Sequence, residues 1–157
     1  AVDWLAPNEK DGVLDLFCGL GNFSLALARR AGQVLGVEGD ETLVRKAEGN
    51  ASVNGINNAR FQARDLFSDS VLDWDPGHYS QILVDPPRGG ALDVLRNLSS
   101  RLNPDRIAYV SCNPATLARD AAYLTGSGGY RLTRLAVADM FPHTAHIESA
   151  ALFERSA

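Results

Sequence analysis

A cysteine between a predicted strand and a predicted helix is the residue of this chain best suited to nucleophilic chemistry. Residues 106–110 form an apolar run typical of a buried parallel strand, and residues 115–124 have the pattern of a helix. Cys112 lies between them and is followed by Asn113, a good N-cap, and Pro114, which suits the first helical position. The positive end of the helix dipole favours a thiolate there. The alternative is a small buried cysteine, but the strand–helix setting favours a nucleophile.

A glycine-rich turn near the start of the chain indicates a cofactor that contains a ribose. The turn, within residues 15–23, joins a predicted strand to a predicted helix, and Gly19 and Gly21 allow a ligand to approach its backbone closely. Glu38 ends the next strand and is suited to accept hydrogen bonds from both ribose hydroxyls. Asp65 ends the third strand and could accept from an adenine amino group.

Two features of this turn favour S-adenosylmethionine over a dinucleotide. Ser24 stands where a dinucleotide fingerprint has its third glycine. Asp15, just before the turn, suits a cationic ligand better than a pyrophosphate and could also order the turn. The alternative is that the acids at these strand ends only cap helices. We expect Cys18 to pack beneath the turn.

A stiff loop of sequence Asp-Pro-Pro-Arg at 85–88 closes the fourth predicted strand. Methyltransferases that act on amino groups use a similar loop whose last residue is an aromatic that stacks on the base. Arg88 takes that place here, which counts against amine chemistry. Asp85 is instead expected to accept a hydrogen bond from a ring N–H, and Arg88 to contact phosphate or solvent.

The elements that position these residues alternate between strand and helix, which predicts an α/β fold with a doubly wound, mostly parallel, seven-stranded sheet. The last two strands follow each other without a helix, so we expect the seventh strand to run antiparallel. Glu148, at its start, would then face the same crevice as Cys112. The expected strands are 12–17, 33–38, 59–63, 79–84, 106–110, 130–138 and 147–153, and the expected helices are 22–31, 41–53, 91–102 and 115–124.

Composition predicts one domain. The chain has 157 residues, of which 45% are hydrophobic and 22% charged, as in ordinary globular proteins. No apolar run is long enough to span a membrane, and no secretory signal is visible. Two cysteines make no disulfide framework, so we expect the cytoplasm. We also expect a monomer. The net charge of −4 argues weakly against a broad nucleic-acid-binding face.

Five motifs in order resemble the RNA uracil-5 methyltransferases, and within them the bacterial branch that acts on 23S ribosomal RNA. The resemblance covers essentially the whole chain and implies a Rossmann-like class I S-adenosylmethionine methyltransferase fold. The motifs are Asp-Leu-Phe-Cys-Gly-x-Gly-Asn-Phe at 15–23, Gly-Val-Glu at 36–38, Asp-Pro-Pro-Arg at 85–88, Ser-Cys-Asn-Pro-Ala-Thr-Leu-Ala-Arg-Asp at 111–120 and Asp-Met-Phe-Pro-His-Thr-x-His-x-Glu-Ser at 139–149.

The resemblance implies roles for these residues. Cys112 would add to C6 of an unstacked uracil in RNA, which makes C5 nucleophilic toward the methyl group. Glu148 would then remove the C5 proton, and Asp85 would hold the N3 edge of the base, with Arg88 beside it. The residues expected at the cofactor are Asp15, Phe17, Gly19, Gly21, Asn22, Phe23, Glu38, Asp65 and Asp85.

The sequence departs from the family by lacking several parts of its longer members. These members carry an N-terminal oligonucleotide-binding barrel, an inserted domain, a Phe-x-Gln-x-Asn segment and, in the ribosomal enzymes, an iron–sulfur cluster. Two cysteines cannot hold such a cluster, so none is expected here. We therefore expect residues 1–157 to be the C-terminal catalytic domain of a longer protein, with poor RNA binding of its own.

Three other interpretations remain open. Methylation of an exocyclic amine would need no cysteine. A module that binds S-adenosylmethionine or RNA without turnover would bind the cofactor and transfer nothing. His143 and His146 could suggest a metal pair, but no further ligand supports one, and we expect no metal.

Overall fold

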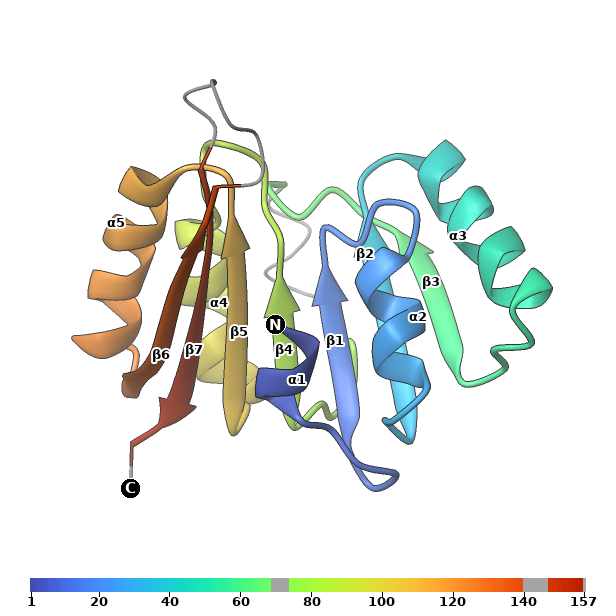
Figure 1. Ribbon diagram of the computed structural model, residues 1–157, viewed down its shortest axis with the longest axis horizontal. Coiled ribbons are helices and arrows are strands. Elements are labelled where there is room, and N and C mark those ends of the chain that lie inside the picture. Colours follow the sequence, from blue (N-terminus) through green and yellow to red (C-terminus); the bar gives the residue numbers. More distant parts are fainter. Residues whose placement is uncertain (69–73, 140–146, 157) are drawn as a thin grey trace.

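In the computed structural model, residues 1–68, 74–139 and 147–156 are described, and they form one mixed sheet with helices on both faces (Figure 1). None of the helices in these ranges is long and apolar enough to cross a membrane. The strands are β1 (Gly12–Leu16), β2 (Gln33–Glu38), β3 (Ala59–Ala63), β4 (Gln81–Val84), β5 (Arg106–Ser111), β6 (Tyr130–Ala138) and β7 (Glu148–Arg155). The helices are α1 (Val2–Leu5), α2 (Asn22–Ala28), α3 (Glu41–Val53), α4 (Leu92–Leu102) and α5 (Pro114–Thr125).

The strand order is β3-β2-β1-β4-β5-β7-β6, which confirms the predicted doubly wound sheet. The pairs among β1 to β5 are parallel, and β7 pairs antiparallel with both β5 and β6. The chain leaves β1 toward β2 and β3 and then returns to add β4 and β5 on the other side. Ligands of such sheets bind at this switch point, beyond the carboxyl ends of the strands.

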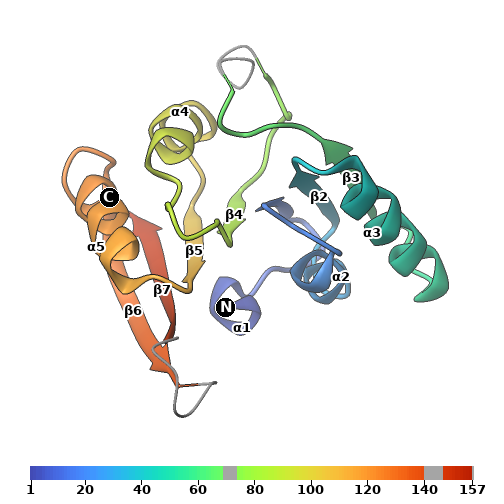
Figure 2. The same cartoon turned by 90° about the horizontal axis from the view of Figure 1, so that it is seen from above.

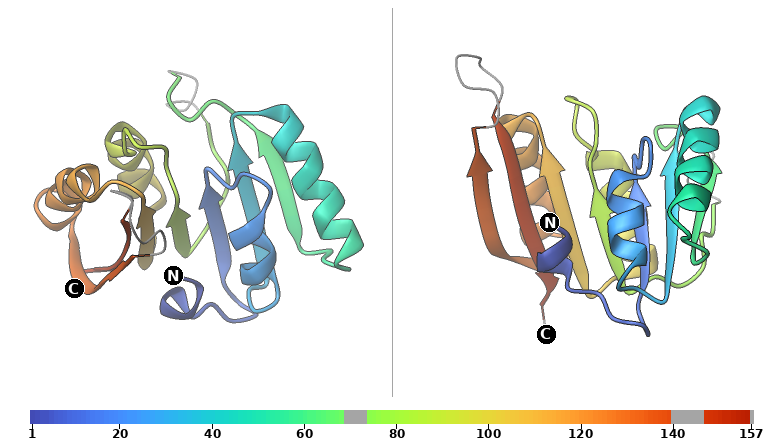
Figure 3. Two further views of the ribbon diagram at one scale, coloured as in Figure 1. Left: turned by 45° about the horizontal axis from the view of Figure 1, so that its top comes forward. Right: turned by 45° about the vertical axis from the view of Figure 1, so that its right-hand side comes forward.

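Alternate residues of the central strands fill two separate layers of the core. Leu14 and Leu16 point to the layer that also holds apolar residues of α4 and α5, whereas Val13 points to the layer under α1 and α2. Figures 2 and 3 show these helices on opposite faces of the sheet, with α1 beside β5. Every residue of β1 is buried, as expected for a central parallel strand.

Local chain geometry shifts several predicted boundaries. β1 ends one residue early because Phe17 takes a left-handed backbone conformation with φ 63°. α2 ends at Ala28 rather than at residue 31, because the amide of Arg30 bonds to the carbonyl of Leu27 in a tightened last turn. β4 begins at Gln81, the first residue in register with Val13. β7 is longer than expected because Arg155 still pairs with β6, and the other ranges agree within about one residue.

Gly36 in β2 offers a test of the packing beneath the glycine-rich turn. A Cβ atom there would lie 2.6 Å from the Phe61 ring and 2.9 Å from the Cys18 Sγ. We expect Gly36→Ala to destabilise the fold by about 1–3 kcal/mol through overpacking. Gly49→Ala is the control, because nothing lies within 4 Å of its added methyl inside α3, and it should stabilise the protein by about 0.5–1 kcal/mol. Urea unfolding measures both, and equal midpoints would contradict this packing.

Candidate active site

The turn after β1 is held in shape by a carboxylate from the neighbouring strand. Glu38, at the end of β2, accepts hydrogen bonds from the amides of Gly19 (3.0 Å), Gly39 (2.7 Å) and Asp40 (3.3 Å). The turn itself runs through left-handed conformations at Gly19 and Gly21, with φ 54° and 84°. Glu38 therefore fixes the turn and keeps one lone pair, on Oε2, to offer a ligand.

A cavity of about 470 Å³ lies at the switch point, where the carboxyl ends of β1 to β4 meet. Four of the predicted cofactor residues line it, namely Phe17, Glu38, Asp65 and Asp85. The rings of Phe17 and Phe67 are 5.4 Å apart and form an apolar part of its wall. The full lining is Phe17, Glu38, Gly39, Arg64, Asp65, Leu66, Phe67, Asp85, Pro86 and Pro87.

Asp15 lies behind this cavity rather than in its wall. Its side chain is fully buried, and its Oδ2 accepts from the Ser24 hydroxyl of α2 at 2.5 Å, while Oδ1 is buried without a hydrogen-bond partner. The predicted role in ordering the turn agrees with this bond. The predicted direct meeting with a cation does not, because the carboxylate reaches no solvent, so it can act on the cavity only through its charge.

The surroundings of the cavity disfavour the ionised form of two acids, Asp15 and Asp85. Burial raises the pKa of Asp15 to about 7, and the charges of Asp85 and Glu38 add to that rise. Burial also raises the pKa of Asp85 to about 6, with a further contribution from Glu148. A cation bound in the cavity would offset the repulsion that Asp15 and Asp85 experience from neighbouring carboxylates.

The structure brings Cys112 and Glu148 to the same end of the sheet. The β5–β7 ladder ends with Ser111 paired to Ser149, and its register continued by one residue sets Cys112 against Glu148. Both residues are partly buried, and the charge of Glu148 helps to raise the pKa of Asp85 at the end of β4. A thiol and two carboxyl groups from three adjacent strands therefore share one edge, as the antiparallel seventh strand predicted.

The start of α5 holds Cys112 in a defined position. The Asn113 side chain caps the helix by accepting from the amide of Ala115 at 3.1 Å, and Pro114 occupies the first turn. The Ser111 hydroxyl accepts from the amide of Asn113 at 3.0 Å. The other cysteine, Cys18, is buried, and burial raises the pKa of its thiol, as expected for a packing residue.

The remaining predicted residues lie around this edge. Gly19, Gly21, Asn22 and Phe23 form the turn and the start of α2 but do not line the 470 Å³ cavity. Arg88 is exposed on the loop after β4. His143 and His146 lie outside the described residues, and within the described ranges no three His, Cys, Asp or Glu side chains gather as a metal site.

Sequence reasoning gave no role to an acid inside α5. Asp120 is fully buried and accepts from the Tyr109 hydroxyl and the Ala91 amide, both at 2.7 Å. The signal was present, because Asp120 stands between Leu117 and Leu124 on the buried face of the helix. A charged residue in an apolar stripe needs partners. Here one partner lies on β5 and the other just before α4.

A family of known proteins matches nearly the whole chain. The family model described as tRNA (Uracil-5-)-methyltransferase matches residues 1–156. The chain belongs to this family. Among curated relatives of the family, the 23S rRNA (uracil(1939)-C(5))-methyltransferases RlmD of Aeromonas salmonicida and Alkalilimnicola ehrlichii are 54% and 55% identical to it. They match 99% and 100% of this chain. The chain spans 35% of the length of each.

Solved structures of other methyltransferases show the same fold. A tRNA (uracil-54, C5)-methyltransferase of Pyrococcus abyssi, in complex with S-adenosyl-L-homocysteine, aligns with a TM-score of 0.80 and 32% identity. The match covers 97% of this chain and 36% of that one. An rRNA methylase of Streptococcus thermophilus aligns over 99% of this chain and 94% of its own, with a TM-score of 0.75 at 13% identity, which shows the fold alone.

Proposed function

We propose that this chain carries the catalytic centre of an enzyme that uses S-adenosylmethionine to methylate C5 of a uridine in ribosomal RNA. The observation that supports it most is the meeting of Cys112, Glu148 and Asp85 at one edge of the sheet, beside an acidic cavity. The 23S rRNA methyltransferases that resemble the chain at 54–55% identity favour ribosomal over transfer RNA. The protein would act in the cytoplasm, on a uridine unstacked from its neighbours.

The residues fit S-adenosylmethionine as cofactor. Phe17 and Phe67 offer apolar surface to an adenine, and Asp65 offers an acceptor for its amino group. Glu38 offers its remaining lone pair to the ribose. The mutual repulsion of Asp15, Glu38 and Asp85 suits the positive charges of the methionine part. When bound, S-adenosylmethionine supplies the electrophilic methyl group.

The proposed reaction uses a covalent adduct because C5 of uracil is too weak a nucleophile unaided. The Cys112 thiolate forms a bond to C6, and the C5–C6 π electrons move onto C5 and O4 as an enolate. Asp85 holds the base at its N3 edge. After C5 has taken up the methyl group, Glu148 removes the C5 proton, the double bond re-forms, and the bond from sulfur to C6 breaks to return the thiolate. Arg88, exposed on the loop that begins with Asp85, can contact an RNA phosphate.

Cofactor affinity should fall as the pH falls from 8 to 5.5. The pKa values of about 7 for Asp15 and about 6 for Asp85 lie above those of ordinary carboxyl groups, so both take up protons in this range and the cavity loses negative charge. We expect the Kd for S-adenosylmethionine to rise about tenfold, since one pKa unit corresponds to about 1.4 kcal/mol. Titration calorimetry measures it at each pH.

Two controls isolate the electrostatic cause of this pH dependence. S-adenosylhomocysteine lacks the sulfonium charge and should show a weaker dependence on pH. Asp15→Asn keeps an acceptor for Ser24 and should flatten the curve near pH 7. A Kd that is constant across the range for both ligands would contradict a role for these acids.

Release of tritium from RNA labelled at C5 of uridine tests the proposed function itself. Methylation at C5 expels the label to water, whereas methylation of an exocyclic amine or of the ribose leaves it in place. We expect tritium release by the complete protein in step with methyl transfer to ribosomal RNA stripped of its modifications. Methyl transfer without tritium release favours amine chemistry, and cofactor binding without any transfer favours a non-catalytic module.

A further inference from the structure

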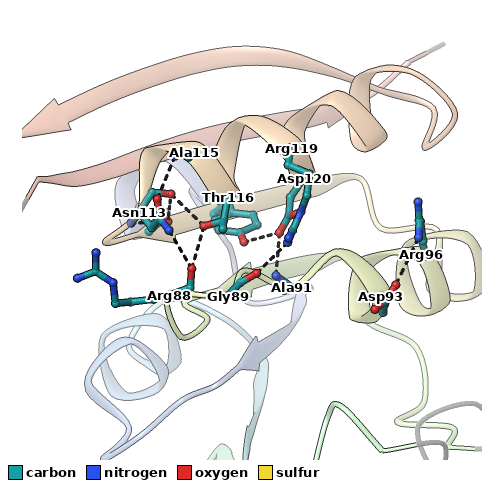
Figure 4. Close-up of polar contacts among 12 residues, drawn as sticks. Arg88, Gly89, Ala91, Asp93, Arg96, Asn113, Ala115, Thr116, Arg119 and Asp120 are labelled. Carbon is teal, nitrogen blue, oxygen red and sulfur yellow. Dashed lines mark hydrogen bonds and ion pairs between the residues drawn. The ribbon is translucent and has the colours of Figure 1, made fainter.

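The loop that follows β4 is tied to helix α5 through its own backbone. The carbonyl of Arg88 accepts from the Asn113 side-chain amide at 3.1 Å and from the Thr116 hydroxyl at 3.3 Å. One residue later, the carbonyl of Gly89 accepts from Arg119 Nη2 at 2.9 Å. Figure 4 shows these side chains in a row along α5, facing the loop. The loop that begins with Asp85 is therefore bound to the helix that begins after Cys112.

An ion pair between the partly exposed Arg119 and the buried Asp120 anchors this row. Asp120 has no exposed side-chain surface, and its Oδ1 receives the Nε of Arg119 at 2.8 Å and its Nη2 at 2.7 Å. Its Oδ2 receives the Tyr109 hydroxyl from β5 and the amide of Ala91, both at 2.7 Å. The carboxylate thus joins β5, α5 and the end of the loop, and each of its oxygens has a donor (Figure 4).

Gly90 is placed where no other residue fits this contact without strain. Its φ of +78° favours glycine, and an added Cβ would lie 2.6 Å from the Arg119 guanidinium, 2.8 Å from Asp120 Oδ2 and 3.1 Å from Thr116 Cβ. Gly89 beside it has open space for a Cβ and no left-handed φ. Of the two glycines, only Gly90 lies against Arg119, Asp120 and Thr116 so closely that a side chain would clash.

We propose that Arg119 and Asp120 are positioning residues for uracil methylation, and that they fix the distance between the base-holding Asp85 and the nucleophile Cys112. The inference rests on the proposed function. Neither residue touches the reacting atoms. Arg119 and Asp120 act through the backbone of residues 89–91, and a loop that is free to drift would present the base to the thiolate in many orientations. Holding two reacting groups in one geometry contributes directly to the rate of the chemical step.

The test compares kcat of Arg119 variants of the complete protein, normalised to the fraction of sites that a 5-fluorouridine RNA can trap. Arg119→Ala should lower kcat 10- to 100-fold, while KM for RNA and Kd for S-adenosylmethionine stay within twofold. Arg119→Lys, which can reach only one of the two partners, should recover part of the loss. Arg96→Ala removes an exposed arginine paired with Asp93 on α4 (Figure 4) and should leave kcat unchanged.

A glycine pair tests the same contact from the loop side. Gly90→Ala should push Arg119 and Asp120 away and lower kcat more than Gly89→Ala does. It should also speed hydrogen exchange of the Ala91 amide, which donates a hydrogen bond to Asp120 in the wild type. This exchange reports the contact without reference to turnover.

The outcomes separate this inference from the proposed function. An active wild type whose Arg119→Ala and Gly90→Ala variants keep the normalised kcat overturns the positioning role and leaves the function standing. Lower melting temperatures with an unchanged kcat per trapped site overturn it in the same way, because they assign the pair to stability. A wild type that releases no tritium from uridine overturns the function and the inference together.

Discussion

Replacing Cys112 by Ala in the complete protein is expected to abolish methyl transfer to RNA, with a loss of at least about 10⁴-fold in kcat. Without the sulfur no bond can form to C6, and C5 stays too weakly nucleophilic to react. The Kd for S-adenosylmethionine should stay within twofold, because Cys112 does not line the 470 Å³ cavity. A radiolabelled-methyl transfer assay and calorimetry measure the two effects on the same preparation.

The second cysteine of the chain supplies a matched control. Cys18 is buried under the glycine-rich turn beside Gly36. Cys18→Ala therefore removes the same thiol group as Cys112→Ala but leaves the proposed nucleophile in place. This variant should lose some stability and keep the activity of its folded fraction. A Cys112→Ala protein that still methylates RNA at more than a hundredth of the wild-type rate would show that the cysteine is not the nucleophile.

Glu148→Gln is expected to lower kcat about 10³-fold and to trap ordinary uridine RNA on the protein. The amide cannot take the C5 proton, so the methylated adduct cannot eliminate the Cys112 sulfur. A covalent protein–RNA complex should therefore build up without any fluorinated base. Denaturing gel electrophoresis with labelled RNA detects it as a slower band.

Glu154→Gln is the control for this variant. Glu154 lies on the same strand but pairs with Arg106 and Arg131, well away from the start of β7. It should turn over normally and leave no covalent complex. Slow turnover of Glu148→Gln without accumulated adduct would assign proton removal to another group and leave Glu148 a role in binding.

The convergence of the candidate site could be predicted because it depends on topology. The carboxyl ends of parallel strands share one edge, so Glu38, Asp65 and Asp85 had to meet there. The sequence pattern predicted no helix between the last two strands, so β7 was expected to run antiparallel and to bring Glu148 to the same edge as Cys112, as its pairing with β5 shows. Neither step needs knowledge of side-chain packing.

What the sequence did not reveal depends on contacts between distant segments. The φ of 63° at Phe17 ends β1 early. The residue type could not predict it, because Phe rarely adopts that conformation. The depth of Asp15 depends on how α2 covers β1 and brings Ser24 to it. The contact of Arg119 with the loop after β4 joins residues 30 positions apart in the chain, because Arg119 donates to the carbonyl of Gly89.

Mass spectrometry of the complex trapped by a 5-fluorouridine RNA with S-adenosylmethionine is the most direct test of the central claim. Fluorine at C5 cannot be removed as a proton, so the adduct should persist through protease and nuclease digestion. We predict one modified peptide, with a nucleotide joined to Cys112 and an added methyl group on its base. A methyl group transferred to the RNA with no nucleotide on Cys112, or a nucleotide joined to a different residue, would contradict the account.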